Sequence, residues 1–158
     1  MVTRILAVVF VIAAGVLLFF LVSGGTHAHG IRAFAAGDYD KAAVAFEKAV
    51  AKKDHPYESH LFLGRIAGIR GEYDAGLDQC DAAISLKPNG PLGLYYKIIL
   101  LQLAGRFRES EKLWDKLSNM GQVNSGFMLA KIANPRPGGG SKELTASEVA
   151  ARIELLKE

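Results

Sequence analysis

Three glycines recur in this chain at one fixed interval, and this spacing constrains the fold more than any other feature. Gly37, Gly71 and Gly105 are each 34 residues apart, and each is followed two residues later by an aromatic residue. Four further triplets keep the same interval: Tyr39, Tyr73 and Phe107; Ala42, Gly76 and Ser110; Phe46, Cys80 and Trp114; Ala49, Ala83 and Leu117. A period of this length is typical of helical repeat arrays. The sequence therefore predicts an all-α solenoid of about three helical hairpins.

Each repeat is expected to consist of two antiparallel helices joined at the recurring glycine. Glycine readily adopts the left-handed conformation that ends a helix, and the aromatic residue would then open the second helix. Small residues at Gly30 and Ala42, and again at Gly64 and Gly76, are expected to let the two helices of a hairpin approach closely. Pro88 follows the second helix of the middle repeat, where the chain must turn back.

These residues resemble the tetratricopeptide repeat family over about residues 23–122, as three units. The resemblance is carried by Gly64, Gly71, Tyr73, Ala83 and Pro88 in the middle unit, and by Gly30, Gly37, Tyr39, Ala42, Phe46 and Ala49 in the first. The third unit departs from the pattern, because Ile98 stands where a small residue is usual and Lys97 where a leucine is typical. The resemblance implies a solenoid whose concave face, formed by the first helix of each unit, binds other proteins.

The predicted organisation has four parts. Residues 1–22 form a transmembrane anchor, 23–134 the solenoid, 135–145 a flexible linker and 146–158 a C-terminal amphipathic helix. Within the solenoid, helices are expected at residues 26–36, 39–53, 57–70, 73–86, 91–104 and 107–120, with a seventh at 124–133 that caps the end of the array. The linker begins with the stretch PRPGGGS, whose prolines and glycines are incompatible with a helix.

The C-terminal segment has the pattern of an amphipathic helix over residues 146–157. Thr145 and Glu148 are spaced as a capping box, and Val149, Ile153 and Leu156 fall on one face. Glu148 is also expected to pair with Arg152 on the helix surface. This helix either folds back into the concave face of its own solenoid or docks on a partner, and the sequence leaves both alternatives open.

The predicted anchor is a run of 18 residues, 5–22, without a charged or polar side chain. As a helix it would span ~27 Å, close to the thickness of a bilayer's hydrocarbon core. A cleaved signal peptide is the main alternative, although its apolar region usually has only ~7–15 residues; a buried helix of a soluble protein is the other. Arg4 precedes the run and the next cation is Arg32. The positive-inside rule therefore places the N-terminus in the cytoplasm and the solenoid in the periplasm or equivalent exported side.

The concave face is the predicted binding groove. Its inward residues are expected to be Phe34 from the first unit; Leu61, Phe62, Arg65 and Ile69 from the second; and Tyr95, Tyr96, Ile99 and Gln102 from the third. An aromatic and aliphatic surface with one cation suits an amphipathic helix or an extended apolar peptide, with Arg65 available for a carboxylate. The alternative is that many of these side chains pack between the units.

One binding mode of the family is not expected here. Family members that bind the acidic C-termini of heat-shock chaperones use lysines and asparagines as a carboxylate clamp. The matching positions of this chain hold His27, Ile31, Leu92 and Tyr96. A co-chaperone of that type is therefore not expected.

The sequence shows no catalytic constellation, so we expect no enzyme, no cofactor, no metal and no small-molecule substrate. His27 and His29 are two apart on a helix and point in different directions, so they read as exposed residues, as do His55 and His60. Cys80 occupies a position that is aromatic in the other units, which predicts a buried structural thiol. Trp114 is expected in the core.

The net charge of +3 is dispersed along the chain, which does not point to nucleic acid. The predicted function is a membrane-anchored protein–protein interaction module, an adaptor or assembly factor for a membrane-associated complex. Its partners would be a membrane-associated protein or peptide segment and, through residues 5–22, the lipid bilayer. The alternative is a constitutive structural subunit of a membrane protein complex, with its groove permanently filled.

Overall fold

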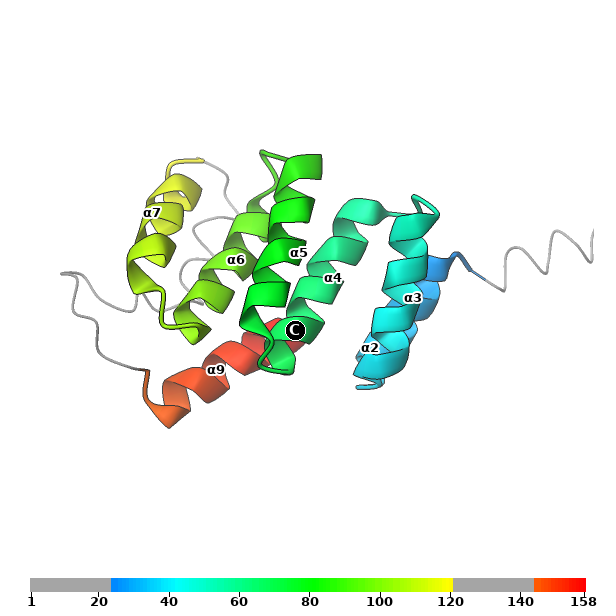
Figure 1. The fold of residues 1–158 in the computed structure, drawn as a ribbon, viewed down its shortest axis with the longest axis horizontal. Helices are drawn as coiled ribbons and strands as arrows, with labels where there is room; N and C mark the ends of the chain where they lie inside the picture. The colour runs from blue at the N-terminus through cyan, green and yellow to red at the C-terminus, as the bar shows by residue number, and fades with distance from the viewer. Residues whose placement is uncertain (1–23, 121–143) are drawn as a thin grey trace, which may run out of the picture.

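The computed structural model describes residues 24–120 and 144–158, and every regular element in these two ranges is a helix. The first range contains α2 (Thr26–Ala35), α3 (Tyr39–Ala51), α4 (Pro56–Ile69), α5 (Tyr73–Leu86), α6 (Pro91–Leu103) and α7 (Phe107–Ser118), and the second contains α9 (Ala146–Lys157). Figure 1 shows α2 to α7 side by side as three successive hairpins, with α9 running across the stack. The all-α prediction is confirmed for the described residues.

The predicted bounds of the first six helices agree with the structure to within two residues at each end. The predicted anchor (residues 5–22), the predicted seventh helix (residues 124–133) and most of the predicted linker lie outside the described residues. Among the helices that the structure does describe, none is both long enough and apolar enough to cross a bilayer.

The recurring glycines form the elbows of the hairpins, as predicted. Gly37, Gly71 and Gly105 have φ angles of 75°, 79° and 74°, in the left-handed region. The residue after each glycine donates its backbone N–H to a carbonyl near the end of the preceding helix; at Gly37 this bond joins the Asp38 nitrogen to the Ala33 oxygen over 2.9 Å. This arrangement satisfies carbonyls that a helix end otherwise leaves unpaired. The aromatic residue two positions later is the first residue of α3, α5 and α7.

The two helices of the middle hairpin meet main chain to main chain. A Cβ atom built on Gly64 would lie 3.1 Å from the backbone oxygen of Gly76, and one built on Gly76 would lie 3.0 Å from the backbone oxygen of Gly64. In the first hairpin, Gly30 instead makes room for the ring of Phe46, which would lie 2.6 Å from an added Cβ. The predicted close approach is therefore present, although a side chain fills the space in the first hairpin.

The third hairpin departs from this pattern, as the sequence indicated. Ile98 and Ser110 are both buried where the other hairpins have small residues. The Ser110 hydroxyl donates to the backbone oxygen of Phe107 at 2.8 Å. Because this bond satisfies the buried hydroxyl within its own helix, Ile98 can pack there without an unpaired polar group.

Two hydrophobic clusters form the core, one centred on the first hairpin and one on the second and third. Cys80 is fully buried in the larger cluster, and burial raises its pKa to about 12, so the thiol is protonated at neutral pH. The prediction of a structural thiol is confirmed. Trp114 is only half-buried, because it packs against the outer edge of this cluster in α7.

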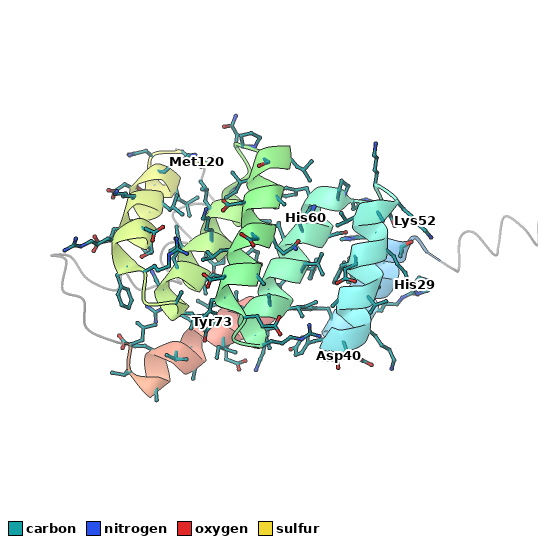
Figure 2. The ribbon with its side chains drawn as sticks, viewed as in Figure 1. His29, Asp40, Lys52, His60, Tyr73 and Met120 are labelled. Carbon is teal, nitrogen blue, oxygen red and sulfur yellow. The ribbon has the colours of Figure 1, made fainter. Side chains whose placement is uncertain are left out.

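The prediction that His27 is exposed is wrong. Its ring is buried, its Nδ1 atom lies 2.9 Å from the Ser59 hydroxyl, and its backbone N–H donates to the Asp54 carboxylate at 2.9 Å. Its ring also stacks on His55, with 5.0 Å between centroids. These contacts join the start of α2 to the turn between α3 and α4 and to the first turn of α4. By contrast, His29 is exposed and points away from the stack (Figure 2).

The close approach in the middle hairpin leads to a stability prediction. Gly76→Val should lower the free energy of unfolding by roughly 3 kcal/mol, because its side chain must displace the backbone of α4. Gly37→Asn is the matched control: nothing lies within 4 Å of an added Cβ there, and asparagine tolerates the left-handed conformation. Urea denaturation followed by circular dichroism measures both. Equal losses for the two variants would contradict the close approach.

His27 leads to a prediction about pH. Burial, followed by the neighbouring His55, lowers the pKa of His27 below its ordinary 6.5, and this outweighs the opposite effects of Asp54 and Glu58. At acidic pH the folded state then binds fewer protons than the unfolded state. The contribution of His27 to the free energy of unfolding is therefore complete above about pH 6.5 and is lost as the pH falls through the lowered pKa.

Denaturation midpoints at about pH 7.5 and about pH 5 test this. His27→Asn should reduce the loss of stability between these pH values, whereas His29→Asn, which removes an exposed ring, should leave that loss as it is in the unchanged protein. An identical loss in all three proteins would show that His27 does not contribute.

Candidate functional site

The helix α9 occupies the concave face of the solenoid. It contacts α4 and α6, which are the first helices of the second and third hairpins. These are the helices that were predicted to line the groove. Of the two alternatives that the sequence left open for the C-terminal helix, the structure has the first, in which it folds back onto its own solenoid.

Arg65 of α4 is the central polar residue of this contact. Its guanidinium is buried and lies over three aromatic rings, with its Cζ atom 4.5 Å from the centroid of Phe34, 4.7 Å from Phe62 and 5.1 Å from Tyr96. The negative faces of these rings stabilise the cation. Burial lowers the pKa of Arg65, but an arginine remains protonated in the physiological range.

The end of α9 supplies an acceptor for this cation. The Nε atom of Arg65 donates to the backbone oxygen of Leu156 at 2.7 Å. Leu156 lies in the last turn of α9, where carbonyl groups have no partner within the helix and the helix dipole is negative. The groove therefore binds a helix C-terminus through a buried cation.

A second polar contact lies one turn earlier along α9. The Nε atom of Arg152 donates to the side-chain oxygen of Gln102 in α6 at 2.6 Å, and its Nη1 atom donates to the Glu148 backbone oxygen at 3.0 Å. Arg152 is buried. The expectation that it lies on the helix surface is wrong, because this side of α9 faces the solenoid.

Leu156 anchors the helix through packing. It is fully buried, and its Cδ1 atom shares with Cδ2 of Leu100 the space above Gly68; a Cβ atom at Gly68 would lie 2.6 Å from the first and 2.5 Å from the second. Val149 and Ile153, which share the predicted apolar face, are half-buried. The missing side chain of Gly68 thus creates a hollow for Leu156. Gly68 is a site residue that was not predicted, although it follows Gly64 by one helical turn and this spacing is a signal for it.

The nine predicted groove residues fall into two groups. Arg65, Gln102, Phe34, Phe62 and Tyr96 come together around α9, either by bonding it directly or by surrounding Arg65. The remaining four belong to the packing of the hairpins: Leu61, Tyr95 and Ile99 are buried, and Ile69 is half-buried between the two hydrophobic clusters. A role in partner binding stays a prediction for all nine.

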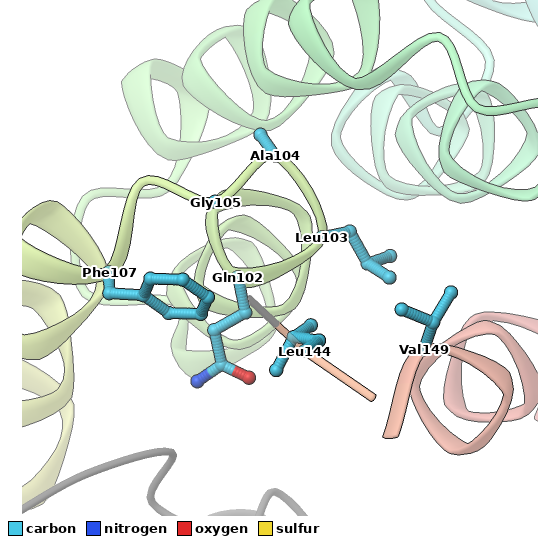
Figure 3. A pocket seen from close by; sticks show the side chains of 7 residues that line it. All are labelled: Gln102, Leu103, Ala104, Gly105, Phe107, Leu144 and Val149. Carbon is cyan, nitrogen blue, oxygen red and sulfur yellow. The ribbon is translucent and has the colours of Figure 1, made fainter. Parts of the chain in front are cut away.

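A pocket of about 490 Å³ lies beside this contact, where the elbow between α6 and α7 meets the start of α9 (Figure 3). It is lined by Gln102, Leu103, Ala104, Gly105, Phe107, Leu144 and Val149. None of these side chains is ionisable, so the described residues that line the pocket supply no group for acid–base catalysis. Within the described residues, no three histidine, cysteine, aspartate or glutamate side chains are grouped to hold a metal ion.

Comparison with known families supports the repeat assignment for part of the chain. Residues 27–91 match the family model described as Tetratricopeptide repeat. The matched segment contains nearly all of the first two hairpins and ends at the first residue of α6. Such repeats imply a protein–protein interaction module. Neither a search of curated proteins nor a search of solved structures gave a match.

The contact at Arg65 leads to a prediction about α9. Arg65→Met keeps a long apolar side chain but removes the bond to Leu156, and a hydrogen bond to a charged group contributes about 1.5–3 kcal/mol. Amide hydrogen exchange in residues 146–157 should then be roughly 10–100-fold faster, measured by mass spectrometry on the full chain.

Arg70→Met is the matched control, because Arg70 is the residue that caps the C-terminal end of the same helix but makes a more exposed ion pair with Asp40. It should leave exchange in α9 unchanged. If Arg65→Met also leaves it unchanged, packing alone holds α9 in the groove.

Proposed function

We propose that this protein is a membrane-anchored protein–protein interaction module that acts as an adaptor or assembly factor for a membrane-associated complex. The observation that carries the proposal is the position of α9 on the concave face. This face receives an amphipathic helix through a hollow above Gly68 and through the polar side chains of Arg65 and Gln102. Helix-in-groove binding is a common mode of peptide recognition, and a partner helix would use the same features.

The apolar run at residues 5–22 supports the membrane anchor. Only Ser23, Gly24 and Gly25 separate it from α2, and a linker this short spans at most about 14 Å. The solenoid would therefore remain beside the bilayer, and its natural partners would be proteins in or on the same membrane. The cation pattern around the run supports a cytoplasmic N-terminus and a solenoid on the periplasmic or equivalent exported side.

A constitutive structural subunit is the second candidate, and the occupied groove favours it. If α9 stays in place permanently, the concave face serves stability and the protein binds its complex through other surfaces. Exposed apolar side chains are available for this, including Val44 and Leu86, which are 50% and 54% exposed. In both cases we propose a protein without enzymatic activity and without a nucleic-acid or small-molecule ligand.

Sizing of the complex separates the two candidates. After mild detergent solubilisation of native membranes, an adaptor should run mostly as free protein with a smaller partner-bound fraction on size-exclusion chromatography. A single large species of fixed stoichiometry would instead identify a constitutive subunit.

In a Val11→Lys/Val16→Lys variant, each lysine opposes membrane insertion by about 2.5–3.5 kcal/mol near the helix centre. This variant should leave the membrane fraction, and its retention there would contradict the anchor.

A further inference from the structure

The contact between α9 and the solenoid leaves two buried hydrogen-bond donors without a partner among the described residues. They are Nη2 of Arg65 and Nε2 of Gln102. Both belong to side chains that already bond α9 through another atom. A buried donor without an acceptor destabilises the state that contains it. The helix α9 is thus an incomplete ligand for this groove.

The unpaired atom of Arg65 indicates which ligand would complete the contact. In a planar guanidinium, Nε–H and one of the terminal nitrogens form a parallel pair of donors along one edge. Carboxylates bind such a pair with two parallel hydrogen bonds, which are stronger than bonds to a neutral carbonyl. In this structure, Nε is bonded to the single backbone oxygen of Leu156, and Nη2 has no hydrogen-bond partner among the described residues. The carboxylate of Glu158 acts on Arg65 through its charge, but it does not accept a hydrogen bond from Nη2. The amide oxygen of Leu156 therefore accepts from Nε only, whereas the two oxygens of a carboxylate could accept from both Nε and Nη2.

The position of that oxygen indicates where the carboxylate would come from. It is a backbone oxygen in the last turn of a helix whose leucine side chain fills the hollow above Gly68. A chain that ended at this residue would place a second oxygen and a negative charge at the same point, beside Arg65. The three aromatic rings around the guanidinium exclude water and strengthen such an ion pair.

We propose that this groove binds the free carboxyl end of a partner's amphipathic helix, which displaces α9, with Arg65 as its carboxylate site. The terminal residue of the partner is a large aliphatic one that takes the place of Leu156. In the absence of the partner, α9 occupies the groove and keeps Arg65 covered. This inference rests on the proposed function, since it specifies the partner of the same face.

Two peptides with the sequence of residues 144–156 test the proposal. One ends in a free carboxylate and the other in a carboxamide, so they differ only in the group placed at Arg65. Each carries an N-terminal fluorophore, and fluorescence polarisation measures its binding to the full chain in one detergent. A Leu156→Ser variant of the full chain is used as well, because it weakens the protein's own α9 and exposes the groove.

The free-carboxylate peptide should bind the Leu156→Ser protein at least about 10-fold more tightly than the carboxamide, as expected for a charge-assisted pair of bonds. Adding Arg65→Met should abolish this preference, while Arg70→Met should preserve it. In the unchanged protein, the free-carboxylate peptide should also speed hydrogen exchange in residues 146–157. Circular dichroism of each variant checks that the solenoid is folded.

Equal affinities for the two peptides, or a preference that survives Arg65→Met, would overturn the proposal. Absence of binding to the folded Leu156→Ser protein would overturn it as well. These outcomes are independent of the adaptor role: a partner-bound fraction on sizing can persist when the peptides fail, and the carboxylate preference can hold when no native complex is found.

Discussion

The arrangement of the whole solenoid depends on how closely two helices can approach in its middle hairpin. Gly64 and Gly76 present backbone atoms to each other so closely that a methyl group on either residue would force the facing backbone to shift by a few tenths of an ångström. This contact holds α4 and α5 together, and α5 in turn packs against α6. The positions of α4 and α6 then define the surface that α9 covers. A larger residue at Gly64 or Gly76 would therefore act both on stability and on the geometry of the groove.

The groove combines two features, an apolar hollow and a buried cation. Above Gly68 the surface accepts a leucine side chain, and next to it Arg65 is surrounded by aromatic rings. A buried cation is unfavourable unless it is paired. The rings and the negative end of α9 supply part of that compensation, so the charge of Arg65 favours the end of α9 beside the hollow. In the proposed binding mode, hydrophobic burial would supply the affinity, and the cation would supply a preference for the C-terminal end of a helix.

Self-occupation of the groove has a quantitative consequence for partner binding. A partner that needs the groove binds only to the fraction of molecules from which α9 has dissociated, so its apparent affinity is reduced by that fraction. If the solenoid is anchored as we propose, its tethering near a membrane would act in the opposite direction, because it would raise the effective concentration of partners in the same bilayer. A weakly occupied groove beside the membrane would thus discriminate against soluble apolar peptides and retain access to membrane-associated partners.

The sequence by itself determined the features that depend on short-range interactions. The 34-residue period predicted the hairpins, the left-handed elbow at Gly71, the close approach of Gly64 and Gly76 and the helix bounds, because each follows from backbone conformation or from side chains a few residues apart. It also placed Arg65 and Gln102 on the concave face. Only the tertiary structure decided that α9 fills this face, that Arg152 and His27 are buried, and that the hollow above Gly68 receives Leu156. These contacts join segments distant in the chain, such as Arg65 and Leu156, 91 residues apart, and their energies depend on surfaces that exist only after the hairpins have stacked.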